Sequence, residues 1–308
     1  MPIERRTITD REDWLSWRKQ DVTASTIGAL FNCHPYITAL HLYAEKRGTE
    51  FPFKDNAAMR RGRWMEPAVA RATMETRPEW TLVPANEYLR DPDLRLGASP
   101  DFYIEGDSRG LGICQTKTVA PSIYAREWQD GAEVPLWIIL QATTEAMLAD
   151  AAFSVIAALL VDPHNMECCI HEMPRNPAAE EKIKAAVAEF WRNVDAGIEP
   201  EPDFARDADV IKAMWKRETD PPIEIDLSGD NRIPDLLAER ATLKTVENDA
   251  HNRIESINTQ LIYAMKDAMV ATGIPDWRIS YKTSHFKAYS VPESDRRILR
   301  ITDQRDKT

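Results

Sequence analysis

The chain has 308 residues, enough for one large domain or two ordinary ones, with a core that needs no disulfide or metal. It carries 39 Lys and Arg against 50 Asp and Glu, and this net charge of −11 argues against nucleic-acid binding through general surface basicity. Glycines number only 11, and neither a Gly-x-Gly-x-x-Gly pattern nor a phosphate loop occurs, which disfavours dinucleotide and P-loop sites. Any contact with DNA is therefore expected to be local.

The cysteines and the apolar runs bear on the cellular compartment of the protein. Cys33, Cys114, Cys168 and Cys169 make no disulfide pattern, and the first residues carry no apolar signal segment. The longest apolar stretch, residues 151–161, is far shorter than the ~20 residues that span a bilayer. We therefore expect a cytoplasmic protein that does not enter a membrane.

The first part of the chain is helical in pattern. Residues 13–31 predict a helix, a short connection at 21–23 and a second helix. Residues 56–74 are again helical in composition but are interrupted at Glu66-Pro67. Because proline donates no backbone hydrogen bond, a kink or a new helix start is expected there. Glu66 is thus expected at a bend.

The middle of the chain mixes strands and helices. Short runs with β-type composition predict strands of one sheet, at residues 80–83, 102–104 and 111–118. A long helix rich in Ala and Leu is then expected, followed by a strand and an amphipathic helix, at residues 134–161, 165–172 and 177–194. This mixture predicts an α/β or α+β core.

Two Pro-rich acidic stretches, residues 198–203 and 220–222, are the best linker candidates. They suggest a core at residues 1–204 and a C-terminal helical appendage at residues 205–308. We expect the appendage to pack on the core, so that the two form one structural unit.

The appendage predicts a long helix and a hairpin. From Leu236 to Ala268, apolar residues recur at intervals of mostly three and four and make one stripe. The stripe packs either on the core of its own chain or in an intermolecular coiled coil. Residues 277–281 and 286–291 then resemble a closing hairpin.

Three separated elements carry residues suited to chemistry. Glu66 lies at the expected bend, Asp101 ends an Ala-Ser-Pro-Asp motif, and Gln115-Thr116-Lys117 lies in an expected strand. Because alternate strand residues share a face, Lys117 stands beside whatever Gln115 binds, and Thr116 offers its backbone carbonyl nearby. Carboxylates and carbonyls are hard oxygen ligands that suit Mg²⁺ or Mn²⁺.

In these residues the chain resembles the phage lambda exonuclease and YqaJ-type viral recombinase family, part of the PD-(D/E)xK nuclease superfamily that includes the RecB nuclease domain. The resemblance covers most of the chain and rests on the order and spacing of several motifs. These are Trp17-Arg18-Lys19, Thr23-Ala24-Ser25, Gly62-x-x-x-Glu66, Ala98-Ser99-Pro100-Asp101, Gln115-x-Lys117-Thr118, Gln141, and Phe190-Trp191 with Gly197-x-Glu199-Pro200.

The resemblance implies a fold, an activity and a place. The fold is a central mixed β-sheet flanked by helices, with a restriction-endonuclease-like core. The activity is a Mg²⁺-dependent 5′-to-3′ exonuclease on double-stranded DNA, which leaves 3′ single strands for recombination in a bacterial or phage-infected cell. A less favoured alternative is an endonuclease or repair nuclease on the same fold.

The resemblance also implies a role for each motif residue. The family positions that hold two Mg²⁺ (or Mn²⁺) ions correspond to Asp101, Gln115, the carbonyl of Thr116, and Glu66. Lys117 orients or deprotonates the attacking water, and Gln141 orients the same nucleophile or a metal-bound water. Two ions ~3.5–4 Å apart stabilise both the attacking and the leaving oxygen.

Other positions are expected to contact DNA. Arg18, Ser25 and Ser99 match family positions that hold a terminal 5′-phosphate through charge-assisted hydrogen bonds. The basic run Arg60, Arg61 and Arg63 is either a solvated helix face or a contact to the phosphate backbone. The resemblance further implies a homotrimer around double-stranded DNA ends and a single-strand annealing protein as a companion.

Position 115 departs from the family, which has Glu there. An amide has nearly the same shape as a carboxylate but no charge, so Gln115 does little to neutralise divalent ions, and we expect weakened turnover. The residue is a change made to trap substrate, the mark of a natural weak or altered nuclease, or a misaligned motif. The rival to an enzyme is a catalytically silent DNA-end binding protein on the same fold.

Overall fold

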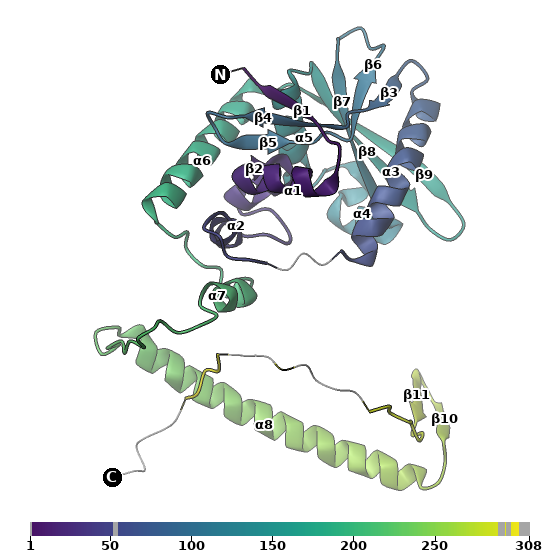
Figure 1. The fold of residues 1–308 in the computed structure, drawn as a ribbon. Helices are drawn as coiled ribbons and strands as arrows, with labels where there is room; N and C mark the ends of the chain where they lie inside the picture. The colour runs from purple at the N-terminus through teal and green to yellow at the C-terminus, as the bar shows by residue number, and fades with distance from the viewer. Residues whose placement is uncertain (1, 52–54, 289–292, 294–296, 302–308) are drawn as a thin grey trace. The chain divides into compact units, whose positions relative to one another are not determined.

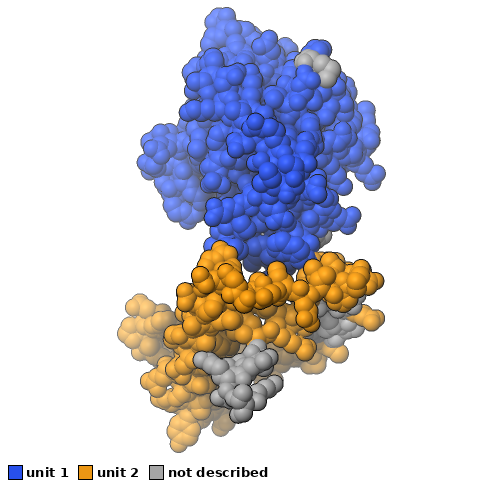
Figure 2. All heavy atoms as spheres, turned by 90° about the vertical axis from the view of Figure 1, so that its left-hand side faces the viewer, with its two compact units in different colours: residues 1–215 blue, residues 216–308 orange. Residues whose placement is uncertain are grey.

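The computed structural model describes residues 2–51, 55–288, 293 and 297–301. The chain divides into two compact units, Met1–Trp215 and Lys216–Thr308 (Figure 2). The first unit extends past residue 204 and includes helix α7 (Ala208–Met214). Packing of the appendage on the core stays a prediction.

A five-stranded mixed sheet forms the centre of the first unit (Figure 1). Its strands, in spatial order, are β3 (Thr81–Pro84), β6 (Phe102–Glu105), β7 (Gly112–Val119), β8 (Phe153–Val161) and β9 (Met166–Pro174). The neighbours β7 and β8 run parallel, and the other neighbouring pairs run antiparallel. The three strands expected between residues 80 and 118 are therefore confirmed as members of one sheet.

The expectation of one helix over residues 134–161 is wrong. Helix α5 (Leu136–Ala149) ends at Asp150, which adopts a left-handed conformation with φ 52°, and the chain then enters strand β8. Because β8 is covered on both faces, all its residues up to Leu160 are buried and no period-2 alternation marks it as a strand. An unbroken apolar run does not distinguish such a strand from a buried helix.

Helices cover both faces of this sheet. Helix α3 (Ala57–Thr76) packs Val69 and Ala70 with Val155, Ala157 and Leu159 on one face. On the other face, α4 (Pro121–Glu127) and α5 pack against the alternate residues of β8. The fold class expected from the sequence, a mixed sheet flanked by helices, is confirmed.

Helix α3 runs through Pro67 as a single element, so the new helix start expected there is wrong, while the kink stays a prediction. Val69 and Ala70, which follow the proline, are buried in the core and anchor the second half of the helix. Glu66 therefore lies inside a helix, half-buried, rather than at an end.

A second, smaller sheet joins the N-terminal segment to the centre of the first unit. Its strands are β1 (Glu4–Thr7), β4 (Glu87–Asp91), β5 (Leu96–Ala98) and β2 (Val22–Thr23), in that order. Helix α1 (Arg11–Gln20) precedes β2, and the second expected helix is a 3-10 helix, η1 (Ala24–Phe31). The unit is completed by α2 (Ala39–Lys46), the short η2 (Gln129–Gly131) and α6 (Pro177–Ala196).

The second unit contains the long helix α8 (Arg232–Met265) and the hairpin of β10 (Val270–Ile274) and β11 (Trp277–Ser280). The helix is confirmed, and the side chains of its stripe are exposed, with Leu243, Val246 and Ile254 each more than half accessible. No helix in the described ranges is long and apolar enough to cross a membrane.

The partner strand of the hairpin differs from the expected one. β11 pairs with the segment before it, across a turn in which Asp276 takes φ 62°. Residues 286–288 of the expected second strand have no regular secondary structure, and its residues 289–291 lie outside the described residues.

Candidate functional site

Asp101 lies in the loop between β5 and β6. The register of the sheet places Phe102 opposite Cys114, so Asp101 faces the next residue of β7, Gln115. Its Oδ2 accepts three hydrogen bonds: from Nε2 of Gln115 (2.7 Å), from the backbone N–H of Thr116 (2.8 Å) and from Oγ1 of Thr116 (2.7 Å). Residues 14 positions apart are thereby joined through one carboxylate oxygen.

A chain of side-chain amides connects β7 to α5. Nζ of Lys117 donates to Oε1 of Gln141 (3.2 Å), and Nε2 of Gln141 donates to Oε1 of Gln115 (2.9 Å). The same Nε2 of Gln141 also donates to Oε1 of Glu145 (2.9 Å). The relay thus runs from a cation through two amides to the carboxylates of Asp101 and Glu145.

Glu145 was not anticipated from the sequence. It lies one turn after Gln141 on α5 and is 1% exposed. Its second oxygen, Oε2, is buried and accepts no hydrogen bond from any residue that the structure describes. The signal that could have identified it is an acid four residues after a motif glutamine, in a helix that is otherwise apolar or uncharged.

Burial shifts the titration of these groups. Burial, together with the charge of Asp101, raises the pKa of Glu145 to about 8 and that of Glu66 to about 7. Burial also raises the pKa of Asp101, against the opposing charge of Lys117, and lowers the pKa of Lys117. Burial therefore works against the charged form of each of these four groups.

The residues expected to hold a 5′-phosphate come together from three elements. Arg18 on α1 donates to Oγ of Ser25 on η1 (2.8 Å) and lies 4.5 Å from the ring centroid of Trp14. Nε1 of Trp14 donates to Oγ of Ser99, in the loop after β5 (2.9 Å). Trp14 thus connects the guanidinium to the second serine.

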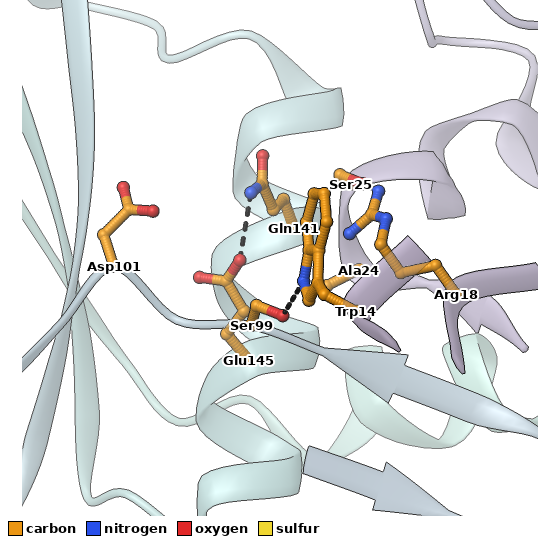
Figure 3. Close-up of a pocket in the computed structure, with 8 residues that line it drawn as sticks. All are labelled: Trp14, Arg18, Ala24, Ser25, Ser99, Asp101, Gln141 and Glu145. Carbon is orange, nitrogen blue, oxygen red and sulfur yellow. Dashed lines mark hydrogen bonds between the residues drawn. The ribbon is translucent and has the colours of Figure 1, made fainter. Parts of the chain in front are cut away.

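These groups share one pocket with the acidic residues. It has a volume of about 200 Å³, and Figure 3 shows Arg18 and Ser25 on one side of it and Asp101 on the other. Its lining consists of Trp14, Arg18, Ala24, Ser25, Ser99, Asp101, Gln141 and Glu145.

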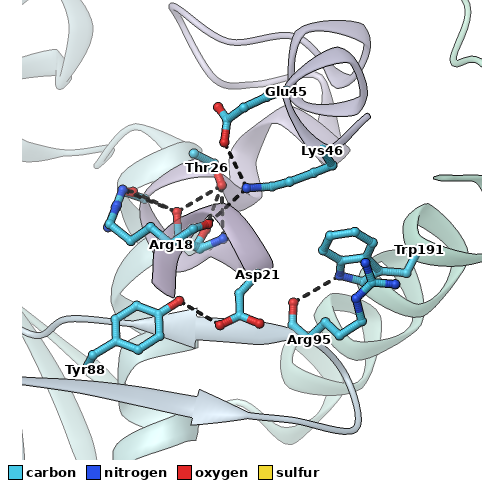
Figure 4. Close-up of polar contacts among 10 residues, drawn as sticks. Arg18, Asp21, Thr26, Glu45, Lys46, Tyr88, Arg95 and Trp191 are labelled. Atoms are coloured by element: carbon cyan, nitrogen blue, oxygen red, sulfur yellow. Dashed lines mark hydrogen bonds and ion pairs between the residues drawn. The ribbon is translucent and has the colours of Figure 1, made fainter. Parts of the chain in front are cut away.

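Arg18 is held from behind by a polar network (Figure 4). Nζ of Lys46 donates to the backbone carbonyl of Arg18 (3.0 Å) and pairs with Glu45 (2.9 Å). Asp21, three residues after Arg18, accepts hydrogen bonds from Oη of Tyr88 (2.9 Å) and Nε of Arg90 (3.0 Å). The guanidinium of Arg18 is therefore directed into the pocket rather than toward Asp21.

The basic run lies elsewhere. Arg60, Arg61 and Arg63 are exposed on the first turns of α3 and do not line the pocket. Arg63 makes a bidentate ion pair with Asp55 (3.1 and 2.8 Å), and Arg60 lies 3.9 Å from the same carboxylate. Glu66, further along the same helix, is close enough for its charge to influence Lys117.

The donors around the pocket suit a hard cation. Within the described ranges, no group of three or more His, Cys, Asp or Glu side chains is already gathered around a metal position. The available donors are nevertheless oxygens, from Asp101, Glu145 and the Gln115 amide, which is the set that Mg²⁺ and Mn²⁺ prefer. The unpartnered buried oxygen of Glu145 is an acceptor that a cation would satisfy.

Comparison with known proteins gives a family and several similar structures. Residues 13–152 match the model of the YqaJ-like viral recombinase domain. An alkaline exonuclease (LHK-Exo) from Laribacter hongkongensis is 22% identical, with 65% of this chain and 100% of that chain covered and a TM-score of 0.49. The structure of LHK-Exo in complex with dAMP is 21% identical, with 66% of this chain and 99% of that chain covered and a TM-score of 0.49.

A phage related exonuclease from Haemophilus somnus 129PT is 14% identical, with 58% and 96% of the chains covered and a TM-score of 0.42. No curated protein matches the chain.

Proposed function

Residues 13–152 match the YqaJ-like viral recombinase domain, and on that premise we propose that the chain is a Mg²⁺-dependent exonuclease of phage-type recombination. It degrades one strand of double-stranded DNA from the 5′ end and generates a 3′ single-stranded overhang. With Gln115 in place of the family's Glu, its turnover is slow.

The observation that carries this proposal is the shared pocket. Arg18, Ser25 and Ser99 offer a guanidinium and two hydroxyls, the donors that bind a phosphate dianion. Asp101 lines the other side of the same pocket. A site that binds a terminal phosphate at a fixed distance from a hydrolytic centre acts on DNA ends, and the cleaved bond is set by where the end is held.

The hydrolytic centre is assigned to the acids and the relay. Asp101, Gln115, the Thr116 carbonyl and Glu66 would hold two divalent ions, which when bound supply Lewis-acid stabilisation of the attacking and leaving oxygens. Lys117, with its lowered pKa, orients or deprotonates the attacking water. Gln141 holds Lys117 in place through Oε1 and fixes the Gln115 amide through Nε2.

Gln115 weakens this centre by its neutrality. Its Nε2 donates to Asp101 over 2.7 Å, a contact that a carboxylate at the same position is unable to make. The amide therefore stabilises the site without metal, whereas an acid would leave two carboxylates face to face until a cation separates them. The proposed nuclease is therefore more stable without metal and turns over more slowly than one with Glu at position 115.

Digestion of end-labelled DNA tests the proposal. A linear duplex should lose nucleotides slowly from its 5′-phosphorylated ends in Mg²⁺, while a closed circular duplex should stay intact and EDTA should stop the reaction. Asp101→Asn should abolish digestion. Cleavage of the circle would favour an endonuclease, and DNA-end binding with no nucleotide release in any metal would favour the silent end-binding protein.

The proposal extends to assembly and partners. A homotrimer that encircles the duplex would bring exposed arginines such as Arg60, Arg61 and Arg63 to the phosphate backbone, despite the acidic charge of the chain. Light scattering of the full chain, with and without DNA, should give a trimer, and a monomer under both conditions would refute the ring. A single-strand annealing protein is the companion that the 3′ overhang requires.

A further inference from the structure

We propose that Glu145 is a metal-binding residue of this site, and that its buried carboxylate shares with Asp101 the divalent ion for which Gln115 provides no charge. The inference rests on the proposed function and deepens it. It adds to the site a residue outside the motif set, brought there by helix α5.

The first support is the state of the Glu145 side chain. Oε1 accepts a hydrogen bond from Gln141, while Oε2 is buried and accepts none within the described part of the chain. A buried acceptor without a partner is destabilising, so proteins rarely keep one that serves no ligand. Figure 3 shows that Oε2 lies on the Asp101 side of the carboxylate, away from the amide that binds Oε1.

The second support is the matching geometry of the two acids. The hydrogen bonds that Gln115 and Thr116 make to Asp101 all fall on Oδ2. Each carboxylate is therefore fixed through one oxygen by the side-chain amide relay, and in each the other oxygen is without an interaction with that relay. Two carboxylates held in this way within one pocket present oxygens in the manner of a divalent-ion site.

The third support is charge. With a neutral amide at position 115, Asp101 would be the only anionic ligand contributed by the β6–β7 side of the site. Glu145 provides a second negative charge from the opposite wall, linked to Gln115 through the single nitrogen of Gln141. The helix thus provides the acid that the strand lacks at position 115, and Gln141 bonds to both Gln115 and Glu145.

A purely structural role makes a different prediction. If Glu145 only anchors Gln141, a glutamine would serve as well, because its Oε1 accepts the same hydrogen bond and its volume is nearly the same. Glu145→Gln then changes nothing except the burial cost of the acid. The two explanations differ in metal affinity, which is measured without turnover.

The experiment is a titration of the full chain with Mn²⁺ alone, followed by electron paramagnetic resonance or calorimetry. Glu145→Gln should weaken Mn²⁺ binding about tenfold or more while its unfolding in EDTA is unchanged or occurs at higher temperature. Asp101→Asn should also lose binding. The matched control is Glu180→Gln, a buried glutamate paired with Arg175 outside the pocket, which should alter stability but leave Mn²⁺ affinity unchanged.

The outcomes separate this inference from the proposed function. Mn²⁺ affinity that is unchanged in Glu145→Gln but lost in Asp101→Asn overturns the inference and leaves the nuclease proposal standing. Affinity unchanged in both variants, with digestion intact in Asp101→Asn, overturns the proposed function itself. Should Glu145→Gln fail to fold, Glu145→Asp provides a second test, because its carboxylate keeps the charge but lies one methylene further from the ion. Mn²⁺ affinity in that variant equal to that of the unchanged chain would equally contradict the assignment.

Discussion

The two ends of the pocket differ in how far the protein completes them by itself. At the cationic end, Arg18 is hydrogen-bonded to Ser25 and stacked on Trp14, which in turn holds Ser99. At the acidic end, Glu145 keeps an unpartnered buried oxygen, and the pKa of each acid is raised. The cationic end is thus preorganised, whereas the acidic end contains buried carboxyl groups whose ionised forms a bound cation would stabilise.

This difference assigns separate tasks to the two ends. A preorganised cluster of donors binds a phosphate without rearrangement, so changes there should affect the preference for a phosphorylated end. Buried carboxyl groups need a cation to stabilise their ionised forms, so changes there should affect metal binding and the chemical step. Each of the following predictions changes one end and asks whether the other is affected.

The largest effect is expected at the acidic end, from Gln115→Glu. A carboxylate at position 115 adds the missing charge and should raise the rate of linear-duplex digestion in Mg²⁺ about 100-fold. It also replaces the 2.7 Å donor contact to Asp101 by a repulsion. The variant should therefore unfold at a lower temperature in EDTA and be stabilised more by Mg²⁺ than the natural chain.

Combined variants of position 115 sharpen this result. Adding Lys117→Ala should remove digestion again without removing Mn²⁺ binding, because the proposed function assigns Lys117 to the attacking water rather than to the ion. Adding Glu145→Gln should cost less Mn²⁺ affinity than it does beside Gln115, since the carboxylate introduced at position 115 then supplies part of the charge. A Gln115→Glu chain that binds ends yet releases no nucleotides would favour the silent binder, and robust cleavage by the natural chain would exclude position 115 as a limiting ligand.

The next effect lies at the cationic end. Arg18→Ala removes a charge-assisted contact worth roughly 1.5–3 kcal/mol, so digestion of a 5′-phosphorylated duplex should fall about ten- to a hundredfold. A duplex with a 5′-hydroxyl end should be digested at nearly the parent's rate for that substrate, and Mn²⁺ affinity should be unchanged. Both rates are measured with Gln115→Glu as the parent, whose faster turnover makes the comparison possible. Equal losses on both substrates would remove the phosphate assignment.

A smaller effect is expected from Trp14→Phe. Phenylalanine keeps a ring beside Arg18 but loses the 2.9 Å hydrogen bond from the indole to Ser99. A neutral hydrogen bond contributes about 0.5–1.5 kcal/mol, so the 5′-phosphate preference should decline about two- to tenfold. A loss as large as that of Arg18→Ala would mean that Trp14 organises the whole cationic end rather than one serine. Mn²⁺ titration again serves as the readout that should not move.

The clustering of several candidate residues could be predicted from sequence because their motifs are short local patterns. Asp101, Gln115 and Lys117 are joined by the register of two neighbouring strands, and alternation along a strand is readable from the chain. The sequence does not single out Glu145 because its link to the site depends on Gln141, whose amide nitrogen bonds to both Gln115 and Glu145. Only the assembled structure shows which side of α5 meets the sheet.

The fold errors have similar causes. The sequence predicts helix across strand β8 because its apolar run is covered on both faces, and Asp150, rather than glycine, makes the left-handed turn before it. The second sheet escaped notice because its strands are two to five residues long and are defined by partners distant in sequence. In both cases tertiary pairing, which no local pattern records, decides the structure.

The smallest expected effect concerns the pH dependence of the support behind the cationic end. Nδ1 of His34 accepts hydrogen bonds from the backbone N–H groups of Tyr36 (3.1 Å) and Ile37 (3.0 Å), and its ring centroid lies 5.5 Å from that of Trp137 on α5. His34 thus fastens the segment after η1, the helix that carries Ser25, in a form that requires a neutral ring. Burial lowers the pKa of His34 below its ordinary value near 6.5.

Because the unfolded chain takes up this proton first, the free energy of unfolding should be full above about pH 6.5 and should decline as the pH falls through and below that value. Because two accepted hydrogen bonds are lost on protonation, the free energy of unfolding should fall by about 1–2 kcal/mol. His34→Asn places an amide oxygen near the position of Nδ1 without a titrating proton, so its stability should decline less between about pH 6.5 and 5. The exposed His164 provides the control, since His164→Asn should keep the full decline. Urea unfolding across this range measures the slope, and identical slopes for His34→Asn and the natural chain would show that His34 does not couple pH to the cationic end.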